Sequence, residues 1–368
     1  MKSLTDNWLL QSSAELLSGN HDPLQNTAWI QNNEQTQTVE VHPICNGALQ
    51  VHSLATLIEQ LIMCDEINVL SGWTAAWEGR IPALDDLFGR GIIREVKCDR
   101  PDTSELSRQY VATICEKPHV KALFDQSAKL FAEGNAVYEG QVINGSIPYL
   151  ILSDQLRLAY CPHPVRSRYL QGELYLDSWG RKQLLEFEKL HEGKRVELVR
   201  RKSNNRNVLT LVSRMSSIAM YCLLNSGEQT NVLHTALQLR ADREFQALRE
   251  LLWEIHVACE SGNNEGAKKK CRSLDRAVDD ASKRLGLAAV GEESGYATFS
   301  FHGLEIELPL AIPKALRLQF PRPRHSSIVY RLLAAHETSD MERALARNFG
   351  IKSKRVIQDM ARLYDGTD

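Results

Sequence analysis

The spacing of hydrophobic residues predicts several amphipathic helices, and the clearest two form an αα-hairpin over 241–285. In its first arm, hydrophobic residues recur at steps of three and four: Phe245, Leu248, Leu252, Ile255 and Cys259. After a Gly/Asn-rich loop the second arm repeats this spacing, with Ala267, Cys271, Leu274, Val278, Ala281 and Leu285. Each arm thus has two hydrophobic positions in every seven residues, along one face of the helix. This pattern predicts antiparallel helices that pack at a shallow angle.

Helical and strand-like patterns alternate near the N-terminus. A step of three and four residues from Leu54 to Ile62 predicts a helix, which runs into a strand-like segment at 67–70. Pro82 suits the first turn of a second helix, and strand-like residues follow at 92–96. This order indicates a small α/β unit.

The same patterns give the expected domain organisation, a mainly α fold of the α+β type. We expect an N-terminal α/β part over 1–103 and a helical body over 104–290 that contains the αα-hairpin. The remainder, 296–368, would hold a β-hairpin and a helix-turn-helix-like end. The β-hairpin is predicted from weak alternation over 296–310 around His302-Gly303.

Composition adds a charge asymmetry to an otherwise ordinary globular chain of 368 residues. The net charge is −2, but the segment from Ile312 to the end holds 11 Lys and Arg against 6 Asp and Glu, or +5. The remainder therefore carries −7. A basic C-terminal segment thus stands beside an acidic body, an asymmetry that separates a DNA-binding role from a protein-binding one only weakly.

The cysteines and the hydropathy pattern bear on the cellular compartment. None of the eight cysteines forms a C-x-x-C pair, the N-terminus is polar, and no stretch approaches eighteen apolar residues. We therefore expect a reduced, cytoplasmic protein with no signal peptide and no membrane span.

The C-terminal segment carries the most specific pattern, that of a helix-turn-helix. Ala346 is small where two helices would cross, and Gly350 follows at the position of a tight turn. Ile351 and Val356 would then fill the core between the helices.

Residues 328–363 resemble the DNA-binding helix-turn-helix of the DeoR class of bacterial repressors. The resemblance is carried by Leu345-Ala346, Phe349-Gly350-Ile351, Val356, Asp359-Met360 and Leu363. It implies that a recognition helix over about 353–363 enters the major groove of double-stranded DNA. Its exposed polar face would consist of Lys352, Lys354, Arg355, Gln358 and Arg362. Lys and Arg hold phosphates and Gln can read adenine; the alternative is a helical cap with a solvated basic face.

Other polar constellations are weaker. Arg166 and Arg168 could grip an anion, although a rigid turn whose arginines pair with carboxylates is the simpler interpretation. Cys161 and His163 could share a metal, but no second ligand pair stands at zinc spacing. Ribonuclease-like Arg–His spacings occur at Arg157/His163, Arg249/His256 and Arg331/His336, about as often as chance predicts. The carboxylates that could form a metal-dependent nuclease site are Asp65, Glu66, Glu78, Asp85 and Asp86.

These patterns favour a non-enzymatic, DNA-associated regulator or assembly factor with no cofactor, no metal and no catalytic residue assigned. The helical body would serve a protein partner or a homo-oligomer. The alternative is a protein-interaction subunit or effector of a bacterial toxin or phage-defence system without direct DNA contact. Nuclease activity is the third interpretation.

Overall fold

The computed structural model describes residues 2–19, 22–33, 38–71, 82–97, 148–149, 158–166, 217–261, 295–301, 304–310, 319–321 and 338–365, with single positions between 112 and 156 and between 263 and 285. The described part is mainly helical and contains a small parallel sheet. By contact the chain forms two units. The sheet unit comprises 2–57, 66–177 and 353–368, and the helix unit comprises 58–65 and 178–352. The three consecutive parts 1–103, 104–290 and 296–368 stay a prediction.

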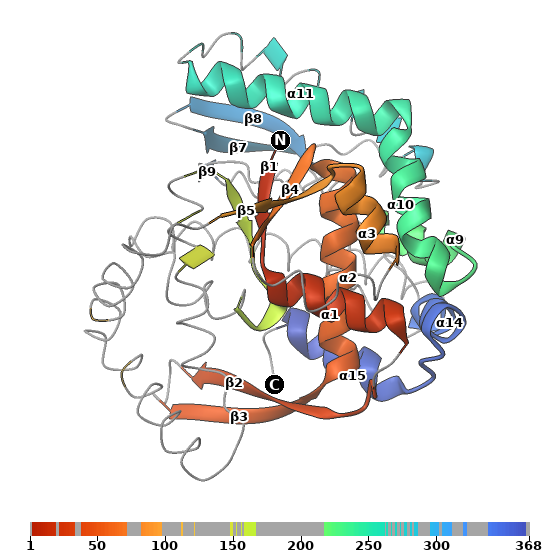
Figure 1. Ribbon diagram of the computed structural model, residues 1–368. Coiled ribbons are helices and arrows are strands. Elements are labelled where there is room, and N and C mark those ends of the chain that lie inside the picture. The colour runs from red at the N-terminus through yellow and green to blue at the C-terminus, as the bar shows by residue number, and fades with distance from the viewer. Residues whose placement is uncertain are drawn as a thin grey trace. The chain divides into compact units, whose positions relative to one another are not determined.

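The sheet unit is built on four parallel strands in the order β5-β4-β1-β6 (Figure 1). The strands are β1 (Lys2–Thr5), β4 (Glu66–Leu70), β5 (Ile93–Val96) and β6 (Ala159–Cys161). In β1, Ser3 pairs with Ile67 of β4 on one side and with Ala159 of β6 on the other. From β1 the chain adds β4 and β5 in one direction, and then returns to place β6 on the opposite side. The strand order therefore reverses between β1 and β6.

Three helices accompany this sheet: α1 (Asn7–Ser18), α2 (Asn46–Met63) and α3 (Pro82–Gly89). The apolar residues whose spacing predicted α2 are all buried, which confirms that helix; they are Leu54, Leu57, Ile58, Leu61 and Ile62. Helix α3 begins at Pro82, as predicted, ends at Gly89 and is followed by Gly91 at φ 67.

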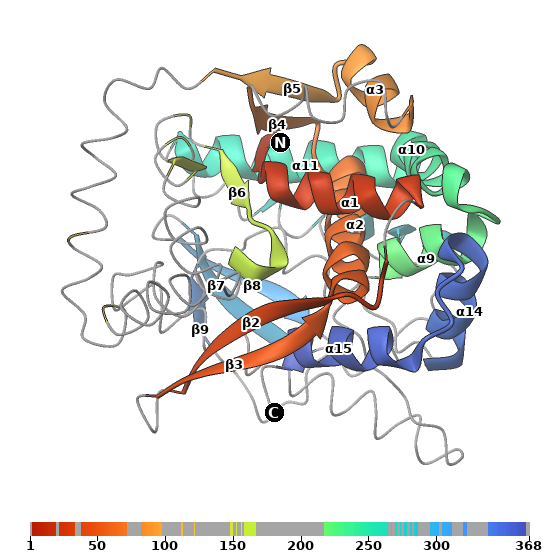
Figure 2. The same cartoon turned by 60° about the horizontal axis from the view of Figure 1, so that its bottom comes forward.

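A two-stranded antiparallel ribbon leaves the same unit between α1 and α2. It consists of β2 (Asn26–Asn33) and β3 (Thr38–Cys45), whose register runs from Asn26↔Cys45 at the base to Asn33↔Thr38. Helix α15 (Lys354–Asp365) packs on β3, and both views show it beside the base of the ribbon (Figures 1 and 2).

The helix unit packs α10 (Val232–Ala241) against α9 (Ser217–Asn225) and α11 (Arg243–Glu260), with a short 3-10 turn η2 (Gln229–Asn231) before α10. Helix α14 (Thr338–Phe349) also packs on α9. Arg240 donates to the carbonyls of Leu61 and Cys64, and Arg249 donates to the carbonyl of Ile62 at 2.7 Å. The two arginines thus satisfy carbonyls at the C-terminal end of α2, which have no partner within the helix itself.

Three further strands form a separate small sheet: β7 (Gly295–Phe301), β8 (Leu304–Leu310) and β9 (Gln319–Pro321). Strand β7 pairs antiparallel with β8 and parallel with β9. The β7–β8 pairing falls on the segment where alternation predicted a β-hairpin.

The αα-hairpin over 241–285 is described only in part. Helix α11 is present, and ion pairs join Glu254 to Lys270 and Asp242 to Arg284. These pairs run in opposite directions along the two segments, as antiparallel arms require. Leu252 is only half-buried, and Leu274 lies outside the described residues, so the hairpin stays a prediction.

The sequence gives no sign of one strand. The stretch from 104 to about 285 was expected to be mostly helical, and within it Ala159–Cys161 forms strand β6 of the parallel sheet. Three residues are too short for strand alternation to show, so only the partner β1 decides the conformation. None of the helices in the described ranges is both long and apolar enough to cross a membrane.

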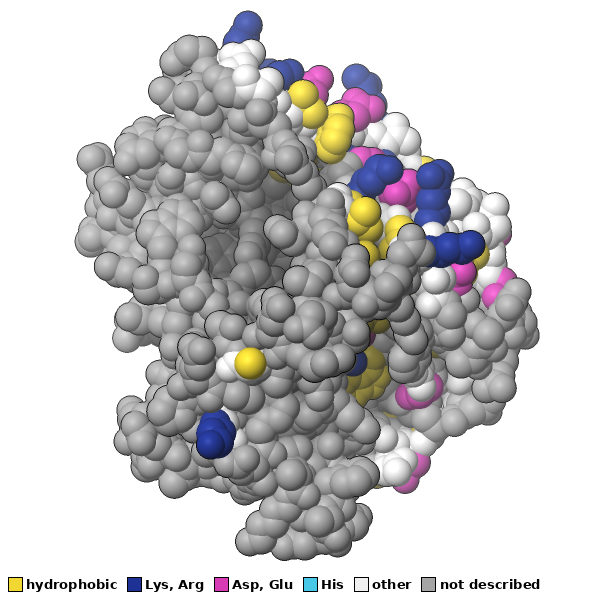
Figure 3. Space-filling model, turned by 60° about the vertical axis from the view of Figure 1, so that its left-hand side comes forward, with side chains coloured by type: hydrophobic (Ala, Val, Ile, Leu, Met, Phe, Trp, Pro, Cys, Tyr) yellow, Lys and Arg dark blue, Asp and Glu magenta, His cyan; other side chains and the backbone are white. Residues whose placement is uncertain are grey.

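Figure 3 views one face of the molecule. On its described part, Lys and Arg side chains are intermingled with Asp and Glu, and hydrophobic side chains lie among them. The described part of this face therefore carries charged side chains of both signs.

Candidate functional site

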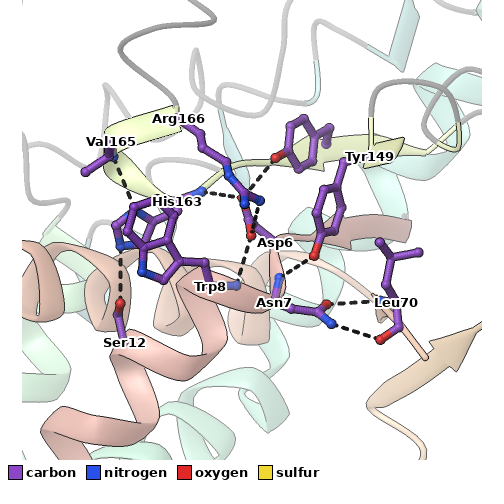
Figure 4. Close-up of polar contacts among 10 residues, drawn as sticks. Asp6, Asn7, Trp8, Ser12, Leu70, Tyr149, His163, Val165 and Arg166 are labelled. Carbon is purple, nitrogen blue, oxygen red and sulfur yellow. Dashed lines mark hydrogen bonds and ion pairs between the residues drawn. The ribbon is translucent and has the colours of Figure 1, made fainter. Parts of the chain in front are cut away.

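Asp6 is the centre of a buried polar cluster at the carboxyl end of β1 (Figure 4). It is the N-cap of α1, where its Oδ1 accepts the Trp8 N–H at 2.9 Å. Its Oδ2 accepts the Tyr160 hydroxyl at 2.9 Å and the His163 N–H at 3.3 Å. Arg166 Nη1 lies 2.8 and 2.7 Å from the two carboxylate oxygens. This buried carboxylate is therefore fully engaged by hydrogen-bond donors.

Arg166 is the cation of the cluster, and its side chain is 12% exposed. The guanidinium lies 5.4 Å from the ring centre of Trp8 and 5.6 Å from that of Tyr149, within cation–π range. Burial lowers the pKa of Arg166, but the carboxylate of Asp6 and the two nearby tyrosines raise it more, so the group stays charged. Its Nε is buried without a hydrogen-bond partner.

His163 is completely buried and stacks on Trp8, with ring centres 3.8 Å apart. Its Nδ1 accepts the Val165 N–H at 3.3 Å, so the ring proton is on Nε2, which lies 3.2 Å from the Ser12 hydroxyl oxygen. Burial first, then the charge of Arg166 and the nearby His52, lower the pKa of His163 well below its usual value. In this tautomer the neutral ring presents N–H to Ser12 rather than a lone pair, which does not fit a Ser–His nucleophile.

Asn7 and Tyr149 extend the cluster to β4. The Asn7 N–H donates to the Tyr149 hydroxyl at 2.9 Å, and the Asn7 side chain forms two hydrogen bonds with the backbone of Leu70, at 2.9 and 3.1 Å. Burial raises the pKa of Tyr149 and Tyr160, with the charge of Asp6 adding to it, so both hydroxyls stay protonated. The cluster therefore joins the carboxyl ends of β1, β4 and β6.

This position is the one where doubly wound sheets bind ligands, outside the carboxyl ends of the strands at the point where strand order reverses. Here the N-terminus of α1 is occupied by the carboxylate of Asp6, and that carboxylate is paired with Arg166. These contacts link β1 and β6 at their carboxyl ends. No described group in the cluster is placed for proton transfer or nucleophilic attack.

Sequence reasoning found part of this cluster. It singled out His163 and Arg166, and the carboxylate pairing that it favoured for the arginines is what Arg166 forms; Arg168 lies outside the described residues. It missed Asp6, although an Asp directly before a hydrophobic helix is an N-cap signal. Both ring nitrogens of His163 are engaged, so the Cys161–His163 metal alternative has no free ligand there. No group of His, Cys, Asp or Glu with metal-binding geometry occurs among the described residues.

The described residues that were considered for a nuclease site do not come together in one place. Glu66 pairs with Lys2 and Arg94, and Asp86 pairs with Arg90; Glu78 lies outside the described residues. Arg249 is committed to the end of α2, while the side chain of His256 is not described.

The C-terminal segment contains two helices, α14 and α15, with Gly350 between them, and its assignment as a helix-turn-helix stays a prediction. Helix α14 ends at Phe349, and Gly350 follows at φ 68 with its N–H donating to the Ala346 carbonyl at 3.1 Å. This left-handed cap favours glycine. Ser353 is placed as the N-cap of α15, because its hydroxyl accepts the Arg355 N–H at 3.3 Å.

The predicted nucleic-acid-binding residues divide into two groups. Lys352, Lys354 and Gln358 are exposed, whereas Ile351 and Val356 are buried. Arg355 is 41% exposed and contacts Asn26 of the ribbon and Asp359 of its own helix. Asp359 in turn accepts the Cys45 N–H at 2.9 Å, next to the start of α2. Arg355 therefore holds the helix in place; the side chain of Arg362 lies outside the described set.

The exposed charges of this segment have one sign. Between Met341 and Met360, a fully described stretch, every charged side chain classed as exposed is a cation: Arg343, Arg347, Lys352 and Lys354. The carboxylate of Asp359 is buried and that of Glu342 is half-buried; Asp340, just before this stretch, is half-buried and pairs with Arg343 at 3.5 Å. This uniform sign contrasts with the mixed charges on the described part of the face in Figure 3.

Comparison with known proteins gave no match to a family model, to a curated protein or to a solved structure.

Proposed function

We propose that this chain is a non-enzymatic, DNA-associated regulator or assembly factor that contacts double-stranded DNA through α15. The observation that carries the proposal is the one-sign charge of the exposed positions between Met341 and Met360. Exposed cations that follow one another in the sequence without an exposed carboxylate between them are typical of a phosphate-binding segment.

The amphipathic build of α15 supports the same role. Val356, Ile357 and Met360 are buried, while Lys354 and Gln358 lie one turn apart on the exposed side. A helix fits the major groove, where a cation positions the protein on phosphates and a Gln amide can pair with adenine. Arg355 contributes by fixing the helix to the ribbon rather than by touching DNA.

The test measures binding of the full chain to a labelled mixed-sequence duplex by fluorescence anisotropy over a series of salt concentrations. Each neutralised phosphate contributes a slope of about −0.9 in log K against log salt. Lys354→Ala should flatten the slope by about 0.9, and Lys352→Ala with Lys354→Ala by roughly twice that. Gln358→Ala should leave the slope unchanged but reduce the preference among sequences.

Lys283→Ala is the matched control, since this exposed lysine pairs only locally with Asp280. It should leave the slope unchanged. The proposal is overturned if the wild-type chain binds no duplex at low salt. It is also overturned if Lys283→Ala flattens the salt slope as much as Lys354→Ala does.

A second candidate, a protein-interaction subunit such as a toxin or phage-defence component, is favoured by one observation on α11. Trp253 and Val257 are 47% and 45% exposed and lie one helical turn apart. If this face joins two copies of the chain, sedimentation should show a mass that rises with concentration. Trp253→Ser with Val257→Ser should abolish that rise; a wild-type monomer at all concentrations rejects self-association.

A further inference from the structure

Two neighbouring cations at the start of α15 differ in what they contact. Arg355 Nη2 donates to the side-chain oxygen of Asn26, and its Nε lies 3.6 Å from a carboxylate oxygen of Asp359. Lys354, the residue before it, is exposed to solvent. The guanidinium is therefore engaged within the protein, while the ammonium group beside it is not buried.

The base of the ribbon contacts both members of the Arg355–Asp359 pair. Asn26 is the first residue of β2 and is paired in register with Cys45 of β3. The Asn26 side chain accepts from Arg355, and the Cys45 N–H donates to Asp359 at 2.9 Å. One register pair thus holds the cation through an exposed amide and the carboxylate through a buried backbone donor.

The attachment of α15 does not depend on the Asn26 contact alone. The apolar residues of the helix up to Met360 are buried, and a Cβ at Gly47 would lie 3.2 Å from the Val356 side chain, so the packing is close. By contrast, the Arg355 side chain is 41% exposed, and exposed ion pairs contribute little to stability. The Asn26 contact therefore determines where the guanidinium lies more than whether the helix stays in place.

Arg355 could bind a phosphate if it were released. A guanidinium holds phosphate oxygens through two parallel hydrogen bonds, and a change of side-chain rotamers exchanges its partners without movement of the helix. Asp359 alone would hold it weakly, because the two groups are 3.6 Å apart and the arginine is half-exposed. The acceptor that Asn26 supplies is thus the contact whose loss would release the cation.

We propose that Asn26 is a positioning residue for the DNA-contacting helix: it holds Arg355 within the protein and so keeps one cation of α15 off the phosphates. This inference rests on the proposed function of α15. The contact limits affinity, because each further phosphate contact tightens binding to every sequence and makes it more sensitive to salt.

The test uses the full chain in the same duplex assay. Asn26→Ala should steepen the salt slope by about 0.9, so its gain in affinity should be roughly threefold larger at about 50 mM than at about 200 mM salt. Asn26→Ala with Arg355→Ala should return the slope to the wild-type value, and Asn26→Gln, which keeps an amide acceptor, should retain it. Gln25→Ala is the matched control, since Gln25 is an exposed amide one residue earlier, and it should not change the slope.

A purely structural role for Asn26 predicts the opposite result. Asn26→Ala would then loosen α15, lower the melting temperature by circular dichroism and weaken binding without a steeper slope, and this outcome overturns the inference. Arg355→Ala alone gives a second measurement that does not require Asn26→Ala to fold. It should leave the slope unchanged; a slope flattened by about 0.9 would mean that Arg355 already contacts a phosphate, which also overturns the inference.

The failure of this inference can be told from the failure of the proposed function. If Lys354→Ala flattens the slope but Asn26→Ala matches Gln25→Ala, the role of Asn26 is overturned and the role of α15 stands. If the wild-type chain binds no duplex at low salt, both proposals fail together.

Discussion

Asp6 and Arg166, 160 residues apart in the chain, form a buried ion pair in which one guanidinium nitrogen reaches both carboxylate oxygens. Asp6 ends β1 and caps α1, while Arg166 follows β6. The pair therefore links the carboxyl end of β1 to the segment that follows β6. Removing one partner of such a pair leaves an uncompensated buried charge.

Asp6→Asn should lower the free energy of unfolding by about 3–5 kcal/mol. The amide can still cap α1, so the loss measures the charge left on Arg166. Urea unfolding followed by circular dichroism gives the value.

The double variant Asp6→Asn with Arg166→Met should cost less than the sum of the two single changes. Arg94→Met is the surface control: Arg94 is 61% exposed in its pair with Glu66, so its loss should stay below about 1 kcal/mol. Strict additivity of the buried pair would contradict its coupling.

His163 should make the fold sensitive to mild acid. Its folded pKa lies well below the usual value because of burial and the charge of Arg166. The contribution of the neutral ring is therefore complete above about pH 6.5, the unfolded value, and is lost as the pH falls below it. Urea midpoints at pH 8, 6 and 5 should decline more steeply for the wild type than for His163→Gln. Parallel declines would show that other groups titrate.

Asp359 should matter for stability through its hydrogen bond to the Cys45 N–H. Asp359→Ala leaves that donor unsatisfied next to the start of α2 and should cost about 1–2 kcal/mol, whereas Asp359→Asn keeps an acceptor and should cost less. Asp340→Ala, which loses only a local pair with Arg343, should change the urea midpoint little. Equal effects of Asp359→Ala and Asp340→Ala would contradict the proposed anchoring role.

Cys45 and Cys222 should be inert thiols in the folded protein. Burial raises the pKa of Cys45 to about 11, with the Asp359 carboxylate adding to it, and burial raises that of Cys222 to about 12. Both thiols therefore stay protonated at pH 8, where the thiolate is the reactive form. Mass spectrometry after iodoacetamide treatment should find both unmodified until urea is added. Labelling of Cys45 at the rate of a free thiol would show that the junction between α15 and β3 opens.

The elements that the sequence predicts are those with local signals. Helix α2 follows from apolar residues at helical spacing, and the end of α14 follows from Gly350, where a left-handed φ makes glycine the favoured residue. Strands β1 and β6 have four and three residues, too few to show alternation. They form strands because they pair with each other across the sheet, as Ser3 does with Ala159. No local sequence pattern encodes that pairing.

The candidate sites divide in the same way. The pattern around Arg166 predicts a carboxylate partner, but only the tertiary structure chooses Asp6. The sequence pattern assigned both Lys354 and Arg355 to the exposed polar face. In the structure Arg355 contacts the side chain of Asn26 at the base of the ribbon, whereas Lys354 is exposed to solvent. Residue type and spacing thus predict which chemical groups a segment carries. Tertiary contacts with residues far away in the sequence decide whether those groups are free to bind a partner.

The pairing of β1 with β6 also orders events on the ribosome. β1 is synthesised before β6, and its second neighbour and the arginine that neutralises Asp6 emerge only after about 160 more residues, roughly 8–30 s at about 5–20 residues per second. During that interval β1 has an open edge, and Asp6 lacks its counter-ion. A nascent chain stalled before β6 should therefore be sensitive to protease at its N-terminus and should bind chaperones, and both properties should disappear once Arg166 has left the exit tunnel.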